Sequence, residues 1–362
     1  MTNPQAAVQR LIDELVASGR ETGLQVAAYR GGLPLVDACA GEAHPGSAVD
    51  GRTLFNSWST GKGTMSALVH VLAERGLLDD TAPVAEYWPE FAAHGKQAVT
   101  LAHVLTHSAG VPQAPEGVTL ADLADWDGMC ARIADLRPQW EAGTATGYHA
   151  LTFGYILGEV VRRVTGRPIV QALREEITEP LGIADELLFG VPSAELPRVA
   201  RLEDGNWAAI VASRPAGSAF FEAAPPAIQP GPDLGNRTAY LTTDVPSAGT
   251  MTARALARMY AALIGEVDGV RLVSPERAAR IGTVVTADTD RVLGIPVPKG
   301  LGYFLGQPGT GPGAFGCKGS GGSIAYADPA NDLTFAFTHN RLTAPPADCA
   351  QLIADELHAA AT

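Results

Sequence analysis

The tetrad Ser59-Thr60-Gly61-Lys62 constrains this chain more than any other stretch, because a helical pattern begins beside it. Apolar residues from Met65 to Leu72 recur at the spacing of one buried helix face. Ser59 and Lys62 are three positions apart, which places both side chains on one side of the first turn. The free backbone N–H groups and the positive end of the helix dipole lie at that same turn. We therefore expect Ser59 to have an amine and hydrogen-bond donors beside it.

These neighbours are what a nucleophilic serine requires, namely a proton acceptor and a site for developing oxyanion charge. A buried lysine loses its proton near neutral pH, because desolvation disfavours the cation. In the alternative interpretation, Ser59 or Thr60 only caps the helix and Lys62 is solvated. Apolar residues on both sides of the tetrad, such as Phe55 and Met65, argue against a solvated lysine. The tetrad by itself leaves both interpretations open.

Composition excludes several classes of protein. With 362 residues, 46% hydrophobic and 18% charged, the chain is expected to fold into a globular protein large enough for two lobes. A net charge of −13 argues against nucleic acid or an anionic membrane as a partner. The four cysteines are far apart and form no metal-binding pattern, so we expect neither a metal nor another cofactor. The start of the sequence lacks the pattern of a secretion signal, which predicts a cytoplasmic protein with reduced thiols.

Helical and strand patterns are unevenly distributed along the chain. A helix is expected over 4–18, followed by a hairpin of strands 24–29 and 33–39 and a short strand at 53–56. Helical periodicity then dominates in 64–77, 101–106, 119–135, 151–165 and 168–178. Residues 185–240 are rich in proline and glycine, and we expect an irregular segment that either walls a pocket or only packs against the core. A helix after Thr250, strands at 302–306, 323–327 and 333–338, and a final helix over 346–360 complete the pattern.

This order predicts an α+β fold, because the strands lie at both ends of the chain and the helices lie between them. The simplest arrangement is one antiparallel sheet flanked by the terminal helices, with an inserted, mostly helical lobe. We expect a discontinuous sheet lobe from 1–57 and 243–362 and a helical lobe from 58–242. Ser59 would then lie at the junction of the two lobes, where binding sites commonly form.

A second stretch, Gly147-Tyr148-His149-Ala150, precedes one of the apolar helices and can present the Tyr148 hydroxyl to a cleft. Beside the Lys62 ammonium, the pKa of Tyr148 is expected to fall, so that the phenol can relay a proton. The alternative is a buried tyrosine with one satisfied hydrogen bond. His149 is interpreted as structural or as part of a substrate-pocket wall. His107 does not support a Ser–His pair, because the sequence has no Gly-x-Ser-x-Gly elbow.

A third stretch, from Phe315 to Ser323, is dense in glycine and precedes a strand pattern. Glycines of this kind let the backbone approach a ligand closely, and a backbone N–H there can serve as a second oxyanion donor. A glycine-rich turn between two strands is the alternative.

Together these three stretches resemble the serine β-lactamase and penicillin-binding-protein superfamily. The closest similarity is to its class C-like branch, which includes the family VIII carboxylesterases and related acyltransferases. The tetrad resembles the family's S-x-x-K, Tyr148 its Y-x-N or relaxed Y-x-x element, and Phe315–Ser323 its K-T-G or H-x-G element. Leu105–Pro112 is similar to the family's LTHTSGLP segment, and Trp140–Gly143 to its W-x-P-G.

The resemblance implies that Ser59 is acylated and that Lys62 and Tyr148 form a coupled proton-transfer pair. It implies an oxyanion hole formed by the backbone N–H groups of Ser59 and Ser320, with Gly319 or Gly321 as alternatives to Ser320. The residues expected to contact substrate are Trp58, His149, Cys317 and Gly319.

Two departures from the family pattern bear on substrate. Ala150 lacks the amide that contacts lysine and substrate in β-lactamases, and Cys317 replaces the Lys or His that helps to hold a substrate carboxylate. Lys318 is adjacent, but successive strand residues point to opposite faces, so it is a poor substitute. Activity on β-lactams or peptidoglycan stems is therefore ranked low.

The predicted function is that of a serine hydrolase that acts on a small-molecule carboxylic ester through an acyl-enzyme at Ser59. The alternative is an acyltransferase that passes the acyl group from an ester or thioester to an alcohol or amine in small-molecule biosynthesis. A non-catalytic binding protein on the same fold is a third hypothesis, which gains weight from Ala150 and Cys317. The expected partners are a small-molecule ester or acyl donor and an amine or alcohol acceptor.

Overall fold

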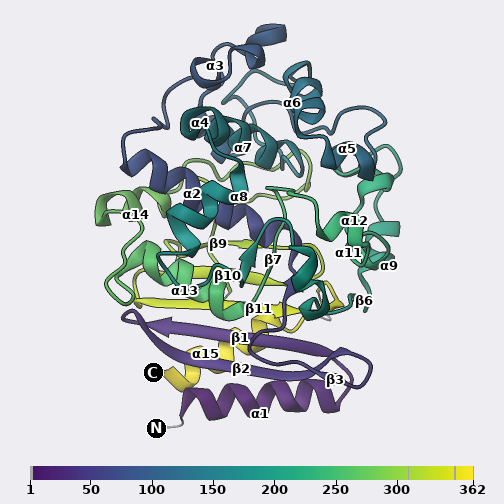
Figure 1. Cartoon of the computed structure of the whole chain (residues 1–362), viewed down its shortest axis with the longest axis vertical. Helices are drawn as coiled ribbons and strands as arrows, with labels where there is room; N and C mark the ends of the chain where they lie inside the picture. Colours follow the sequence, from purple (N-terminus) through teal and green to yellow (C-terminus); the bar gives the residue numbers. More distant parts are fainter. Residues whose placement is uncertain (1–2, 309, 346–347, 362) are drawn as a thin grey trace.

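The computed structural model describes residues 3–308, 310–345 and 348–361 (Figure 1). Its centre is a seven-stranded antiparallel sheet in the order β3-β2-β1-β11-β10-β9-β8. These strands are β1 (Gly23–Arg30), β2 (Leu33–His44), β3 (Ser47–Ala48), β8 (Phe304–Leu305), β9 (Phe315–Lys318), β10 (Ile324–Asp328) and β11 (Leu333–His339). The α+β arrangement expected from the sequence, one antiparallel sheet with a mostly helical middle of the chain, is confirmed.

The two ends of the chain meet inside this sheet. Strand β1 pairs with β11 in a register that runs from Leu24 opposite His339 to Arg30 opposite Leu333. Every strand of the sheet therefore comes from residues 23–48 or 304–339. The division into lobes at residues 57 and 242 stays a prediction.

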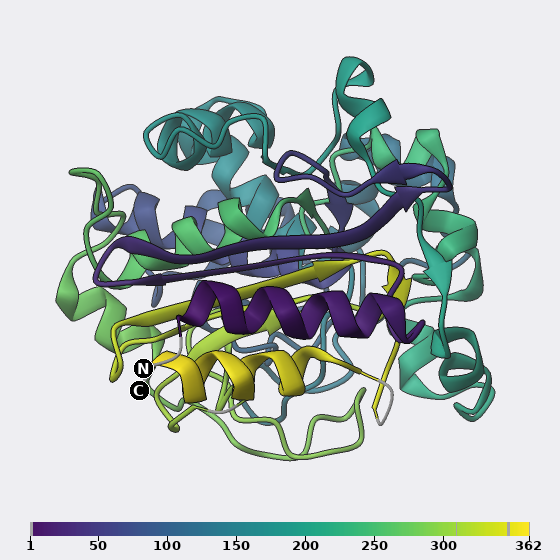
Figure 2. The same cartoon turned by 90° about the horizontal axis from the view of Figure 1, so that it is seen from below.

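Each face of the sheet has its own core, because side chains alternate along a strand. On one face, Leu24 and Val26 of β1 pack in a cluster with Ile12 of α1 (Pro4–Ala17) and Ile353 of α15 (Ala350–Ala361). Figure 2 shows these two terminal helices side by side against the sheet. On the other face, Ala27 belongs to a larger cluster shared with α2 (Gly61–Glu74) and α13 (Ala253–Ile264).

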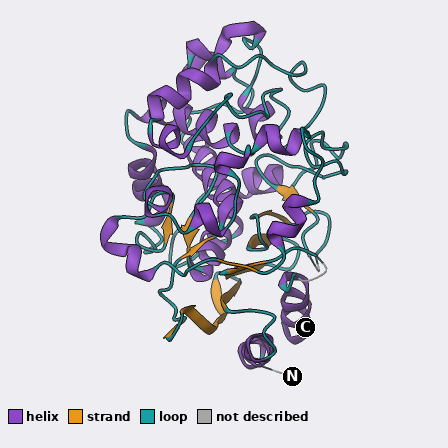
Figure 3. Cartoon of the chain, turned by 90° about the vertical axis from the view of Figure 1, so that its right-hand side faces the viewer, coloured by secondary structure: helices purple, strands orange, loops and turns teal. Residues whose placement is uncertain are grey.

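The middle of the chain is mostly helical and lies on the far side of the sheet from the terminal helices (Figure 1). Figure 3 shows strands between the helices at the two ends of the chain and the larger group of helices. Helix α2 is buried from Gly61 through Ala73, and α7 (Thr152–Thr165) packs against it. The remaining α-helices are α3 (Val84–Tyr87), α4 (Leu101–Leu105), α5 (Leu120–Ala124), α6 (Trp126–Ala134), α8 (Ile169–Leu173), α9 (Trp207–Ala212), α10 (Ala219–Ala223), α11 (Pro232–Gly235), α12 (Thr238–Leu241) and α14 (Pro275–Ile281).

Short strands and single turns complete the structure. Strand β7 (Thr250–Met251) pairs with β4 (Phe55–Asn56) and β5 (Leu187–Leu188), and β12 (Arg341–Leu342) pairs with β6 (Glu203–Asp204). The other short helical elements are η1 (Trp58–Thr60), η2 (Pro89–Gly95), the π-helical η3 (Arg174–Thr178), η4 (Ser193–Arg198) and η5 (Pro226–Ile228), and η2 is kinked at Ala93 and His94. Within the described ranges, no helix is long and apolar enough to cross a membrane.

Several expected elements differ in their bounds. The helix expected over 119–135 is two helices, because the Asp125 carboxylate accepts the Gly128 N–H and starts α6 as a new helix. The last helix begins at Ala350 rather than 346, and residues 346 and 347 lie outside the described residues. Strand β9 and helix α14 are among the elements that were not predicted, as are the short helices α3 and α9–α12. Strand β9 is short and rich in glycine, so the alternation that identifies a strand is weak.

Candidate active site

Ser59 lies in the single turn η1, between strand β4 and helix α2. The preceding residue, Trp58, has φ +49°, a left-handed conformation that a bulky side chain rarely adopts. Its ring packs on Tyr240, with 5.2 Å between the ring centroids. This sharp turn is held by hydrogen bonds, including one from the Trp58 N–H to the Asn56 side chain. The turn brings both Trp58 and Ser59 to the wall of one cavity.

The Lys62 amine is held by three oxygens. Its Nζ lies 3.2 Å from Ser59 Oγ, 2.7 Å from the Ala150 carbonyl and 3.0 Å from the Ser247 carbonyl. Lys62 is only 3% exposed, and among the described residues no carboxylate forms an ion pair with it. Burial therefore lowers the pKa of Lys62 to about 7, although the nearby Cys317 opposes the shift. Near neutral pH, a large fraction of this amine is uncharged.

Tyr148 lies beside the same pair, in the loop before α7. Lys62 Nζ is 4.8 Å from the centre of its ring, and the Ser59 side chain lies near enough to its phenol to influence the pKa of Tyr148. The ring also packs against His107, with 5.1 Å between the ring centroids. The expected fall in the pKa of Tyr148 is wrong. Desolvation raises the pKa of Tyr148 above its ordinary value, and the neighbouring Ser59 side chain offsets this only in part.

The glycine-rich end of β9 approaches Ser59 from the sheet. A Cβ atom added at Gly319 would lie 2.0 Å from the Ser57 carbonyl oxygen and 3.5 Å from the Ser59 nitrogen. Only glycine therefore allows the backbone to come this close. Ser320 lines the cavity next, and in the described part of the chain its N–H donates no backbone hydrogen bond. Ser59 and Ser320 thus line the same cavity.

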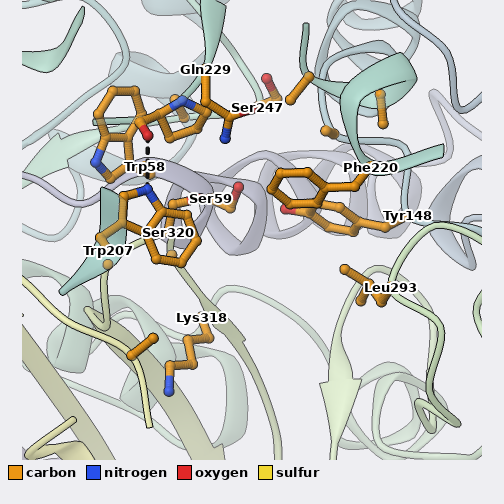
Figure 4. Close-up of a pocket in the computed structure, with 18 of the residues that line it drawn as sticks. Trp58, Ser59, Tyr148, Trp207, Phe220, Gln229, Ser247, Leu293, Lys318 and Ser320 are labelled. Atoms are coloured by element: carbon orange, nitrogen blue, oxygen red, sulfur yellow. Dashed lines mark hydrogen bonds between the residues drawn. The ribbon is translucent and has the colours of Figure 1, made fainter. Parts of the chain in front are cut away.

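These residues surround a cavity of about 480 Å³ (Figure 4). Figure 4 shows Ser59 between Trp58 and Trp207 on one side and Tyr148 and Phe220 on the other. The irregular segment expected to wall a pocket supplies much of the lining, including Trp207, Ile210, Phe220, Ile228 and Tyr240. The lining is mainly apolar, which suits a substrate with apolar substituents.

The structure does not bring two of the expected substrate contacts to the cavity. His149 is fully buried, with its Nε2 accepting the Val111 N–H and its Nδ1 2.6 Å from the Gly147 carbonyl oxygen. Cys317 faces the core below β9, with its Sγ 3.9 Å from the Gly302 carbonyl oxygen. The next residue, Lys318, which strand alternation places on the other face, lines the edge of the cavity instead, and its amine pairs with Asp348. Trp58 and Gly319 do line the cavity.

Sequence reasoning missed three polar residues around this cavity. Ser247 supplies a carbonyl to Lys62, and Asp290 accepts the Tyr148 N–H. Lys299 forms a fully buried ion pair with Asp290. The one available signal was the scarcity of lysine, since the chain has four and Lys299 stands in an apolar run. Asp290 and Ser247 carried no local pattern. Across the described ranges, no three His, Cys, Asp or Glu side chains are grouped so as to hold a metal ion.

Comparisons with known proteins agree on the family. A β-lactamase family model matches residues 8–360. The "Esterase/beta-lactamase LipL" of Mycobacterium tuberculosis is 38% identical, over 94% of this chain and 82% of that protein. A crystal structure of a family VIII carboxylesterase matches with a TM-score of 0.88 and 33% identity, covering 99% of this chain and 96% of the other. A penicillin-binding-protein homologue from Caulobacter crescentus has a TM-score of 0.87 and 33% identity, with coverage of 99% and 98%.

Proposed function

Since this chain belongs to the β-lactamase family, we propose that it is a serine carboxylesterase that cleaves small-molecule esters through an acyl-enzyme at Ser59. The observation that carries the proposal is the 3.2 Å contact between Lys62 Nζ and Ser59 Oγ at the wall of an apolar cavity. Similarity to a protein named as an esterase/β-lactamase and to a family VIII carboxylesterase supports the same reaction class.

Lys62 is suited to act as the base. A neutral amine has two N–H donors and one lone pair. The Ala150 and Ser247 carbonyls occupy the two donors, which leaves the lone pair for the Ser59 hydroxyl proton. Attack by Ser59 Oγ on the ester carbonyl then forms the C–O bond while Lys62 takes the proton. The N–H groups of Ser59 and Ser320 stabilise the negative oxygen of the tetrahedral intermediate.

Tyr148 is suited to act as the acid, because its raised pKa keeps the phenol protonated. When the intermediate collapses, the ester C–O bond breaks and the phenol protonates the leaving alkoxide. The Lys62 ammonium beside the ring returns a proton to the phenolate. Water then attacks the acyl-enzyme, gives a proton to the same relay and releases the carboxylic acid and free Ser59.

The cavity favours neutral esters over β-lactams. Two cations line the described part of the cavity: Lys318 is already paired with the Asp348 carboxylate, and Arg214 stacks on the Phe220 ring. A substrate carboxylate would have to compete with one of these contacts for its anchor. We therefore rank β-lactamase and peptidase activities below ester hydrolysis. Acyl transfer is the second candidate function, because the apolar lining disfavours water near the acyl-enzyme and can accommodate an apolar alcohol or amine acceptor.

A p-nitrophenyl ester series with mass spectrometry tests the proposal. We expect a burst of p-nitrophenol and an acyl adduct on Ser59, and no turnover by Ser59→Ala. Ser57→Ala is the matched control, since the Ser57 hydroxyl is buried on the Phe55 carbonyl and should leave the adduct intact. A folded wild-type protein with no adduct would favour a binding role. Adding an alcohol or amine acceptor distinguishes transfer from hydrolysis by the product formed.

A further inference from the structure

Asp290 joins two parts of the site that are far apart in the sequence. Its Oδ1 accepts the Tyr148 N–H at 3.0 Å and the N–H groups of Val292 and Leu293 at 2.9 Å each. Asp290 is fully buried, although it lies in a long loop between α14 and β8. A single carboxylate oxygen thus receives three backbone donors. Two of these donors belong to residues of the cavity wall, and the third belongs to the proposed proton donor.

The second oxygen of Asp290 faces Lys299. Oδ2 and the Lys299 Nζ are 3.0 Å apart, and both residues are fully buried. The Lys299 amine also donates to the Thr146 hydroxyl at 2.9 Å, two residues before Tyr148. Thr146 in turn accepts the Arg291 N–H through its carbonyl at 2.9 Å. The loop around Asp290 and the loop that carries Tyr148 are therefore joined by several bonds centred on one ion pair.

The pair is poorly explained by stability alone. Desolvating two charges offsets much of their attraction, and apolar replacements of buried ion pairs are often neutral or stabilising. What an apolar pair does not supply is an oxygen that accepts three N–H groups at fixed directions. The Tyr148 backbone has no helix or strand to fix it, because the residue precedes α7. Among the described residues, the Asp290 carboxylate is therefore the group that accepts the Tyr148 N–H and fixes this amide.

We propose that Asp290 is a positioning residue, whose carboxylate holds the Tyr148 phenol against Ser59 and the Val292–Leu293 wall against the substrate. Lys299 neutralises the buried carboxylate and ties it to the Tyr148 loop. Asp290 does not touch the reacting atoms in this arrangement. The inference rests on the proposed function, because it assigns Asp290 a part in orienting the proposed proton donor.

Two double variants that remove both buried charges distinguish the effect of the hydrogen-bond acceptor at position 290 from the effect of its charge. In Asp290→Asn/Lys299→Met, the amide oxygen can still accept the three N–H groups and no buried charge is left unpaired. In Asp290→Ala/Lys299→Met, the charges are equally absent, but so is the acceptor. We expect the Asn/Met variant to keep kcat within about tenfold of wild type and the Ala/Met variant to lose a further 10- to 100-fold or so, since misplacing a reacting group by about 1 Å has effects of this size.

The same comparison in a Tyr148→Phe background identifies the route of the effect. If Asp290 acts through the phenol, the kcat difference between the two double variants should largely disappear once the phenol is absent. Equal kcat values for the two double variants when Tyr148 is intact, or an unchanged difference in the Tyr148→Phe background, would overturn the proposal. Thermal unfolding of each variant shows that the compared samples are folded.

Amide hydrogen exchange at Tyr148 gives a readout that does not depend on turnover. We expect faster exchange at this amide in the Ala/Met variant than in the Asn/Met variant; equal protection in the two contradicts the positioning role. If the proposed function itself were wrong, the wild-type protein would neither turn over the ester nor form the Ser59 adduct, and this outcome is distinct from a failure of the positioning role. The amide result would still report whether Asp290 fixes Tyr148.

Discussion

The amine of Lys62 lies 3.2 Å from the hydroxyl of Ser59 and donates hydrogen bonds to two backbone carbonyls. A contrasting buried lysine, Lys96, donates to three backbone carbonyls at 2.6–2.9 Å and contacts no hydroxyl. Both amines are desolvated, but only Lys62 has a neighbour that can give up a proton to it. This difference separates a candidate base from a structural lysine on the same chain.

Replacing Lys62 with methionine should lower kcat for a p-nitrophenyl ester by at least about 10³-fold, because the serine loses its proton acceptor. Lys96→Met is the matched control. It should lower the unfolding temperature, since three buried carbonyls lose their donor, but keep kcat per folded molecule. Steady-state kinetics with active-site titration measures both. Comparable kcat losses in the two variants would remove Lys62 from the role of base.

The pH dependence of kcat/KM should report the Lys62 amine. Burial lowers the pKa of Lys62 to about 7, and the neutral amine is the active form, so activity should rise with pH through a midpoint near 7. Profiles from pH 5.5 to 9 on a non-ionisable ester measure this. Activity that falls with rising pH across this range would exclude an amine base.

Tyr148→Phe should reduce kcat by on the order of 10²–10⁴-fold, as expected for loss of a proton-transfer group. The midpoint near pH 7 should remain, because desolvation raises the pKa of Tyr148 and the phenol does not titrate in this range. Full activity in the variant would remove the phenol from the mechanism. A lost midpoint would instead make Tyr148 the titrating group.

Gly319→Ala should disrupt the approach of β9 to Ser59. The new Cβ would lie 2.0 Å from the Ser57 carbonyl oxygen, so the backbone must move. Displacing an oxyanion donor lowers kcat by about 10²–10³-fold, and overpacking costs about 1–3 kcal/mol of stability. Gly311→Ala is the control, since an added Cβ there meets nothing within 4 Å. Kinetics and thermal unfolding of the pair test this; wild-type kcat in Gly319→Ala would contradict the close approach.

His339 should give the protein a pH-dependent stability. Its Nδ1 faces the Glu21 carboxylate at 2.9 Å and its Nε2 faces the Gly321 carbonyl at 2.8 Å. Burial favours the neutral ring, but Glu21 outweighs it, and the net effect is a pKa of His339 above the usual 6.5. The imidazolium therefore contributes its full stabilisation below pH 6.5, and this contribution is lost as pH rises through the folded-state pKa.

Urea unfolding of wild type and His339→Gln measures that contribution. The difference in unfolding free energy between them should be larger at pH 6 than at pH 9. A difference that stays constant, or grows with pH, would show that the ring is not charged in the folded protein.

The sequence alone predicted the longer helices and strands and the core of the candidate site. Helical periodicity identified α1, α2 and α7, and the spacing of Ser59 and Lys62 predicted their contact, because both signals are local. The glycine-rich stretch around Gly319 was also visible as a place of close backbone approach. These features depend on residues within one or two turns of each other.

The tertiary structure decided which groups surround the Ser59–Lys62 contact and in which direction their pKa values shift. His149 and Cys317 stand next to cavity residues in the sequence, yet the loop and strand geometry turns them into the core. The direction of the Tyr148 pKa shift and the burial of the Asp290–Lys299 pair depend on packing by segments more than a hundred residues away. Desolvation is a property of the whole surrounding volume, so the folded chain determines it and the local pattern does not.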